Sequence, residues 1–138
     1  ACDAIVAESE PWKTLQEKVD FGQAITRKQA YACTRSGSGT IEVAGFIIFT
    51  AEPVFARGGY LRAIGVAASL RGQGIGGKLM AFAEKTVSRQ AAYLYLCVSS
   101  FNRQSQAFYK KRGYTRVGKL PGLTAPGSSE YIYWKRLK

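Results

Sequence analysis

The sequence predicts an α/β fold, because apolar segments typical of strands alternate with amphipathic segments typical of helices. Residues 42–50 and 92–99 are nearly continuous in apolar side chains, as strands inside a sheet are. Between residues 60 and 99, a strand, a glycine-rich loop, a helix and a second strand follow one another. Such a crossover unit places its two strands parallel in one sheet. The length of 138 residues suits a single domain, residues 1–138.

The start of the chain predicts short helices. Residues 3–9 fit a short helix or a strand equally well. Residues 9–16 open with a Ser and a nearby Pro, which suit a helix start, and residues 20–29 fit a second short helix. The sequence begins at Ala1 without a Met, which is compatible with the loss of a first strand.

The next segment predicts a hairpin and a third strand. Residues 31–34 and 42–50 are expected to pair as strands joined by a Ser/Gly turn. Residues 51–59 then form a loop that leads into a strand over 60–67. Gly65 in this strand indicates a bulge or a close approach of another backbone.

A helix is predicted over residues 74–89, directly after the glycine loop. Apolar residues recur at helical spacing and are expected to form its buried stripe: Ile75, Leu79, Phe82, Ala83 and Val87. The strand at 92–99 follows and should be central, because it carries almost no polar side chain.

The end of the chain predicts one more helix and two closing strands. Residues 102–113 form the helix, with Asn102 as its cap and Gly113 at its end. Residues 114–119 and 130–137 are the strands, and the segment between them is a loop.

The charge is strongly positive and unevenly placed. The chain carries +11 overall, with five Lys or Arg against seven Asp or Glu in residues 1–52. Residues 53–138 carry fifteen against two, Glu84 and Glu130. The later part of the chain therefore favours an anionic partner, which could be a polyphosphate cofactor, an acidic substrate or RNA.

Residue types that are absent or rare in the chain exclude several kinds of active site. The chain has no His, which removes Ser-His and Cys-His nucleophilic pairs and the commonest metal ligand. Cys2, Cys33 and Cys97 show no paired spacing, so we expect reduced thiols in a cytoplasmic protein without a metal site. No apolar run approaches the roughly 18 residues of a membrane span, so no membrane partner is expected.

The glycine-rich stretch "RGQGIGGKLM", residues 71–80, fits three phosphate-binding patterns. A nucleoside triphosphate loop requires Ser or Thr after Lys78, where this chain has Leu79. A dinucleotide-binding loop requires an acidic residue at the end of the next strand, and "AYLYLCVSSFN" contains none. The third pattern, R/Q-x-x-G-x-G, suits the pyrophosphate of coenzyme A and fits through Arg71, Gly74 and Gly76.

A second motif supports the third pattern. "LCVSSFNRQSQAFYKKRGY" matches N-x-x-A/S-x-x-x-Y-x-x-x-G-Y/F, and "GYLRAIGVAASLRGQGIGGKLMAFAE" has the shape of a strand, pyrophosphate loop and helix. With both motifs in this order, residues 41–118 resemble the GNAT superfamily of acyl-CoA N-acyltransferases. The resemblance implies a mixed, mostly antiparallel sheet whose central parallel pair, 60–67 and 92–99, splays apart, with helices on both faces.

The resemblance also implies where acetyl-CoA binds. The backbone of Ile64, Gly65 and Val66 would face the pantetheine arm in the gap between the splayed strands. Asn102 would hold the amides of that arm, with help from Ser105. The pyrophosphate would take main-chain N–H groups of the loop and the charge of its first residue: Arg71, Gly72, Gln73, Gly74, Ile75 and Gly76.

By the same resemblance, Tyr109 is the general acid that protonates the departing CoA thiolate. A main-chain N–H of strand 60–67 would hold the oxyanion. The general base stays open, because "YLRAIGV" has no acid where many relatives place a Glu. Glu42, Glu52 or a water chain are the alternatives. Cys97 lacks an activating partner and is interpreted as a core residue.

The resulting hypothesis is an N-acetyltransferase that moves the acetyl group of acetyl-CoA directly to an amine acceptor, as a monomer or homodimer. Nucleic acid is not expected as a partner. The acceptor pocket should be framed by the N-terminal helices around Trp12, Leu15 and Phe21 and by the loops at 51–59 and 120–129. Aromatic residues are expected either to line it or to lie in the core: Phe55, Tyr60, Tyr131 and Tyr133. An acyl-CoA sensor without activity and an RNA-binding module are the alternatives.

Overall fold

The N-terminal segment forms three short helices in the computed structural model, which describes residues 1–138. They are α1 (Cys2–Ala7), α2 (Trp12–Leu15) and α3 (Phe21–Thr26). The segment 3–9 is therefore mainly helical. Asp20 caps α3, because its Oδ1 accepts a hydrogen bond from the Gln23 N–H at 3.0 Å. Ile5, Val6 and Ala24 are buried, so these helices pack on the sheet through small apolar faces.

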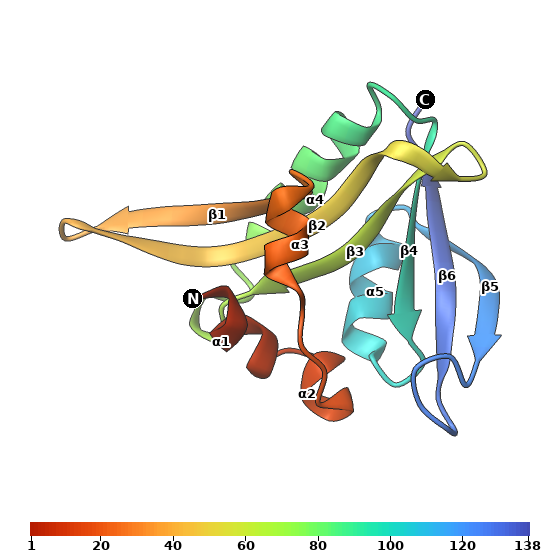
Figure 1. Cartoon of the computed structure of the whole chain (residues 1–138), viewed down its shortest axis with the longest axis horizontal. Coiled ribbons are helices and arrows are strands. Elements are labelled where there is room, and N and C mark those ends of the chain that lie inside the picture. Colours follow the sequence, from red (N-terminus) through yellow and green to blue (C-terminus); the bar gives the residue numbers. More distant parts are fainter.

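Three antiparallel strands follow: β1 (Ala30–Gly37), β2 (Thr40–Phe55) and β3 (Gly58–Val66). The predicted hairpin is present, but the loop predicted at 51–59 is wrong. The strands run on to a tight turn at Ala56 and Arg57, which have φ values of 40° and 66°. This left-handed backbone matches the twist of a two-residue hairpin, although neither residue type signals it. Figure 1 shows the β1–β2 hairpin reaching far from the rest of the sheet.

The crossover unit forms as predicted. A single 3-10 turn, η1 (Ala68–Leu70), precedes α4 (Ile75–Val87), and β4 (Tyr93–Ser99) returns through the sheet. Leu79, Met80, Ala83 and Val87 are the buried residues of α4. The prediction for Phe82 is wrong, since 44% of it is exposed and its ring rests against Tyr31 at a centroid distance of 4.9 Å.

The last elements are α5 (Arg103–Lys111), β5 (Thr115–Pro121) and β6 (Ser129–Arg136). Asn102 caps α5 as expected, and Gly113 ends it with a φ of 88°. None of the helices in the chain combines the length and apolar character needed to cross a membrane.

The six strands form one sheet in the order β1-β2-β3-β4-β6-β5. Only β3 and β4 are parallel, and every other neighbouring pair is antiparallel. The predicted mixed, mostly antiparallel sheet with a central parallel pair is confirmed.

The parallel pair opens along its length. β3 and β4 pair from Gly58 and Tyr93 only as far as Leu61 and Leu96, although both strands continue beyond these residues. The next residue of β3, Arg62, is the extra residue of a bulge against β2. A bulge bends its strand and increases the twist. The bulge therefore accounts for the divergence of β3 from β4.

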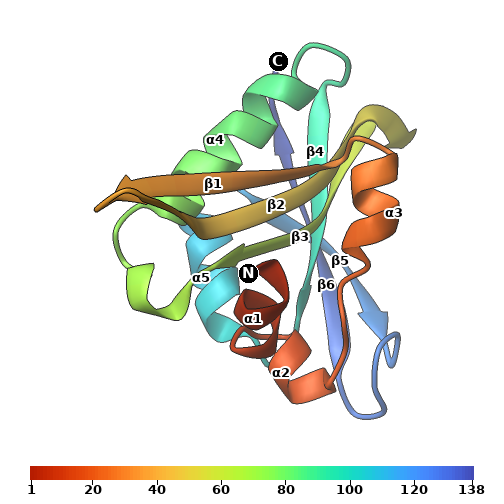
Figure 2. The same ribbon diagram turned by 60° about the vertical axis from the view of Figure 1, so that its left-hand side comes forward.

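Helices cover both faces of the sheet and define two cores. On β2, Phe46 and Ile48 pack with α1 and α3, whereas Ile47 and Phe49 belong to the core beneath α4 and α5. This alternation follows from the two-residue period of a strand and explains why residues 43–49 of β2 carry no polar side chain. Figures 1 and 2 show α1, α2 and α3 on one side of the sheet and α4 and α5 on the other.

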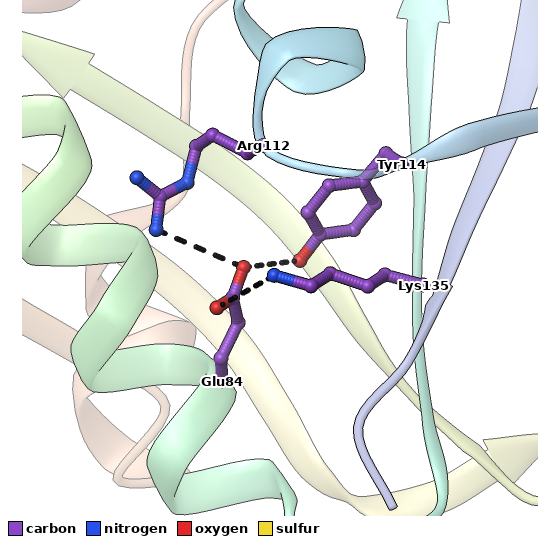
Figure 3. A network of polar contacts seen from close by, with 4 residues as sticks. All are labelled: Glu84, Arg112, Tyr114 and Lys135. Atoms are coloured by element: carbon purple, nitrogen blue, oxygen red, sulfur yellow. Dashed lines mark hydrogen bonds and ion pairs between the residues drawn. The ribbon is translucent and has the colours of Figure 1, made fainter.

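A polar network fixes α4 to the end of α5 and to β6 (Figure 3). Glu84 of α4 accepts hydrogen bonds from the Tyr114 hydroxyl and the Lys135 Nζ, both at 3.1 Å. Its Oε1 also lies 3.8 Å from an Nη atom of Arg112. Burial, followed by the nearby Glu84 carboxylate, raises the pKa of Tyr114, so its hydroxyl remains a donor. The network holds α4, and hence the glycine loop, in place.

Candidate active site

Two cavities meet where β3 and β4 diverge. The larger is a cleft of about 640 Å³ between the glycine loop, the outer part of β3 and the start of α5. The smaller is a pocket of about 170 Å³ between the divergent strands, α2 and the β5–β6 loop. Four residues border both cavities: Glu10, Ile64, Asn102 and Ser105. The two cavities are therefore adjacent compartments.

The glycine loop presents free backbone donors to the cleft. Gly72 and Gly74 have φ values of 75° and 82°, which glycine adopts without strain. The N–H groups of residues 72–77 donate to no carbonyl of the chain, because they lie in the loop or in the first turn of α4. An added Cβ at Gly72 or Gly74 would meet no heavy atom within 4 Å. This open row of donors at a helix N-terminus fits a phosphate group or diphosphate.

Arg71 lies at the wall of the cleft, but its guanidinium is already engaged. Nε donates to the Val66 carbonyl at 3.2 Å, and one Nη donates to the Glu8 carbonyl at 3.1 Å and the Ser9 Oγ at 2.9 Å. The side chain therefore ties the glycine loop to the end of α1.

Ile64, Gly65 and Val66 border the cleft, as predicted from the resemblance. The bulge of this strand falls at Arg62 and not at Gly65. A Cβ on Gly65 would lie 2.7 Å from Phe46 and 2.9 Å from Ile5. The glycine is thus required by close packing under α1, a reason that the sequence pattern does not reveal.

The start of α5 and all but one of the other predicted loop residues border the same cleft. Gly72, Gly74, Ile75 and Gly76 border it, and Gln73 does not. Asn102 Oδ1 accepts a hydrogen bond from the Ser105 N–H at 3.1 Å. This leaves the Asn102 amide nitrogen without a partner in the chain, beside both cavities.

Tyr109 borders the smaller pocket from α5. Only 5% of it is exposed, and its ring packs against Phe108 and Tyr114 at centroid distances of 5.2 and 5.7 Å. Burial, with a smaller effect of the nearby Tyr60, raises the pKa of the phenol above its ordinary value. Tyr109 is therefore a protonated donor at neutral pH.

Tyr60 of β3 and Cys97 of β4 both border the smaller pocket. Burial raises the pKa of the Cys97 thiol, and a hydrogen bond with Tyr60 partly opposes this effect. Burial, followed by Cys97, also raises the pKa of Tyr60. The thiol is neutral at pH 7, as expected for a residue that is not a nucleophile.

The walls of the smaller pocket agree in part with the expected acceptor site. Trp12 and Leu15 of α2, Tyr60 of β3 and Thr124 of the β5–β6 loop border it. Other expected residues lie elsewhere. Phe21 packs against Phe46, Phe55 is exposed at the β2–β3 turn, Tyr131 stacks under Arg116, and Tyr133 is buried in the core.

A buried acid in this pocket was missed by the sequence analysis. Glu130 at the start of β6 is 7% exposed and borders the pocket. Glu42 and Glu52, the two acids considered as bases, are exposed, and neither borders a cavity described here. The available signal was that Glu130 is one of only two acids after residue 52.

Residues 3–114 match the family model described as the acetyltransferase (GNAT) family. This match confirms the resemblance carried by the two motifs. No curated protein matches the chain in sequence.

Solved structures share the fold. A chain of the NatC complex bound to Gag peptide and CoA is 19% identical, with a TM-score of 0.80 over 98% of this chain and 87% of that one. Ard1 from Thermoplasma volcanium is 21% identical, with a TM-score of 0.76 over 96% and 87%. An aminoglycoside 6′-N-acetyltransferase complexed with coenzyme A is 20% identical, with a TM-score of 0.70 over 97% and 87%. At these identities the likeness is one of fold.

Proposed function

Since the chain belongs to the acetyltransferase (GNAT) family, we propose that it transfers the acetyl group of acetyl-CoA directly to an amine, with Tyr109 as general acid. The observation that carries this proposal is the junction of the two cavities. A row of free phosphate-binding donors leads along the opened strand to a pocket that holds a neutral, buried phenol.

The larger cleft would take acetyl-CoA. The N–H groups of residues 72–77 would bind the diphosphate, with the dipole of α4 adding to their effect. The pantetheine arm would lie beside Ile64, Gly65 and Val66, where β3 has lost its partner strand. Asn102 and Ser105 would contact the arm where the cleft meets the smaller pocket. Solved structures of this fold include complexes with CoA, which supports acetyl-CoA as the co-substrate.

The amine would enter the smaller pocket and attack the thioester carbon. A C–N bond forms, the C–S bond breaks, and a main-chain N–H of β3 stabilises the oxyanion between these events. Tyr109 gives its proton to the departing thiolate. Because its pKa is raised, the phenol is fully protonated at neutral pH and is ready to donate.

A thermal-shift experiment tests the cofactor. We expect acetyl-CoA and CoA to raise the unfolding temperature, because ligand binding to the folded state stabilises it by about 2.7 kcal/mol at 100 times Kd. ATP and NADH should give much smaller shifts, since they lack the pantetheine arm. Stabilisation by ATP or NADH without stabilisation by CoA would contradict the proposal. CoA binding without acetylation of any amine would favour an acyl-CoA sensor.

A further inference from the structure

Glu130 is a buried carboxylate without a cation. Its Oε1 accepts hydrogen bonds from the Ser99 Oγ at 2.6 Å and the Thr124 Oγ1 at 3.3 Å. All the ion pairs of the chain are formed by two other acids, Glu42 and Glu84. Glu130 therefore has no ion-pair partner, although the chain carries twenty Lys and Arg.

This arrangement leaves one oxygen of the carboxylate free in the pocket. A buried carboxylate loses its hydration and normally regains energy from a paired cation. Here two hydroxyl donors serve one oxygen, and Oε2 has no partner in the chain. Because Glu130 borders the smaller pocket, a cation in that pocket would supply the missing partner.

The fold brings four segments together to make this site: β4, β6, the β5–β6 loop and α5. Glu130 lies opposite Ser99 in the β4–β6 register, at the end of β4 that has separated from β3. Thr124 comes from the β5–β6 loop and closes the far side. Tyr109 borders the same pocket from α5 with its hydroxyl unpaired. The pocket therefore contains a buried anion and a buried proton donor in about 170 Å³.

We propose that Glu130 binds the acceptor as an ammonium ion and takes its proton, so that the pocket selects cationic amines. The proposal rests on the acetyl transfer proposed above and supplies its missing general base. Glu10 and Glu17 are exposed acids at the same pocket and strengthen its preference for a cation. Arg62 is the single cation among the residues that border it, and it is exposed.

The protons balance as follows. The carboxylate of Glu130 takes one proton from the ammonium and leaves a neutral amine with a free electron pair. The amine nitrogen bonds to the thioester carbon, and the C–S bond breaks as Tyr109 protonates the thiolate. The new amide nitrogen loses its second proton, which replaces the one that Tyr109 gave. Glu130 then releases its proton to solvent, so each turnover yields an amide, CoA and one proton.

The test compares Glu130→Gln with the wild type on a panel of alkyl mono-, di- and polyamines, with acetyl-CoA consumption as the readout. Glutamine keeps the shape and can still accept from Ser99 and Thr124, but it cannot take a proton. We expect kcat/KM at pH 7 to fall roughly 100-fold or more. We expect Glu130→Asp to retain part of the activity. Glu42→Gln on the β1–β2 hairpin is the control and should leave kcat/KM unchanged.

The pH profile separates a base from a structural residue. An alkylamine has a pKa near 10, so the free neutral amine increases about tenfold per pH unit below that value. The Glu130→Gln variant should therefore gain activity about tenfold per pH unit and approach the wild type at high pH. Other groups that titrate or carry charge at this pocket are present in both proteins and cancel in the comparison: Tyr60, Arg62, Cys97, Tyr109, Glu10 and Glu17.

Two further measurements distinguish a failure of the inference about Glu130 from a failure of the proposed function. Glu130→Gln should unfold close to the wild-type temperature, because glutamine keeps the shape and can still accept from Ser99 and Thr124. It should also keep the shift caused by CoA. Unchanged kcat/KM, or no acetylation of any cationic amine by a protein that CoA stabilises, would overturn the inference. Absence of any shift with CoA would overturn the proposed function itself.

Discussion

The Tyr109 ring is buried between Phe108 and Tyr114, and this packing affects its phenol. This burial raises the pKa of the phenol and holds the ring in place at the border of the smaller pocket. A donor whose pKa lies above 10 stays protonated through pH 9, so its own ionisation should not limit activity there. The same burial makes Tyr109 part of the core, so a variant that tests its role has to keep the ring.

Tyr109→Phe keeps the ring and removes only the hydroxyl. We expect kcat to fall about 100-fold with little change in the CoA-induced shift of the unfolding temperature, because the lost proton donor acts on the thiolate. Tyr133→Phe is the matched control, since the Tyr133 hydroxyl has no partner in the chain and Tyr133 lies outside both cavities. It should retain full kcat. Full activity of Tyr109→Phe would remove Tyr109 from the mechanism.

Glu130 shows why some residues of the site could not be predicted from the sequence. Tyr109 and Asn102 lie in one motif within a single helix and its cap, so their spacing in the sequence is enough to select them as candidates. Glu130 acquires its environment from Ser99 on β4 and Thr124 in a loop, which only the strand register brings together. The same holds for Gly65. Ile5 and Phe46, which are distant in the sequence, leave no room for a side chain at this position.

The glycine loop and α4 act as a single element. Gly72 and Gly74 have left-handed backbone, and the N–H groups of the loop and of the first turn of α4 donate to no carbonyl of the chain. The Glu84 network fixes the other end of α4 against Lys135 and Tyr114. The donors are therefore held in place before any anion arrives.

Gly74→Ala tests this preorganisation. The φ of 82° should cost the variant about 1–2 kcal/mol, and the new methyl group would project into the open cradle. We expect both a lower unfolding temperature and a smaller shift with CoA. Gly39→Ala is the control, because Gly39 has a φ of 79° and equally free surroundings in the distant β1–β2 turn. It should lose similar stability and keep the full CoA shift. Equal CoA shifts in the two variants would show that the loop does not contact the cofactor.

Elements with strong local signals were predicted well, and those without them were not. α4 and α5 have glycine or asparagine at their ends and apolar residues at helical spacing. The turn at Ala56 and Arg57 has neither glycine nor asparagine, so a tight hairpin looked like a loop. Phe82 fits the apolar stripe by spacing, but the tertiary position of Tyr31 gives it an exposed aromatic contact instead.

Arg71 connects the glycine loop to the N-terminal helices, which lie far apart in the sequence. Its guanidinium bonds to Glu8 and Ser9, which lie 63 and 62 residues earlier in the chain. This contact holds the N-terminal helices, and with them Glu10 and Trp12, over the cavities. The side chain therefore organises the site even where it adds no charge to a bound phosphate.

Arg71→Ala should lower the stability of the free protein. Three hydrogen bonds from a charged donor are lost, two of them at the surface, for which we expect about 1–2 kcal/mol and a measurable fall in unfolding temperature without CoA. Ser9→Ala is the companion variant, because it removes one of these bonds without touching the loop. It should lower the temperature by a smaller amount. A variant of Arg71 that is as stable as the wild type but insensitive to CoA would assign the side chain to the phosphates alone.

If the protein has the proposed function, the wall shared by the two cavities determines how the two substrates bind during catalysis. Since Glu10, Ile64, Asn102 and Ser105 border both compartments, we expect both substrates to be bound together at the moment of transfer. Catalysis would then proceed through a ternary complex, and no acetylated form of the protein would accumulate. A single molecule that joins a cationic amine to the sulfur of CoA would occupy both compartments at once. Its two halves would bind with the effective concentration of a short tether, far above that of separate ligands.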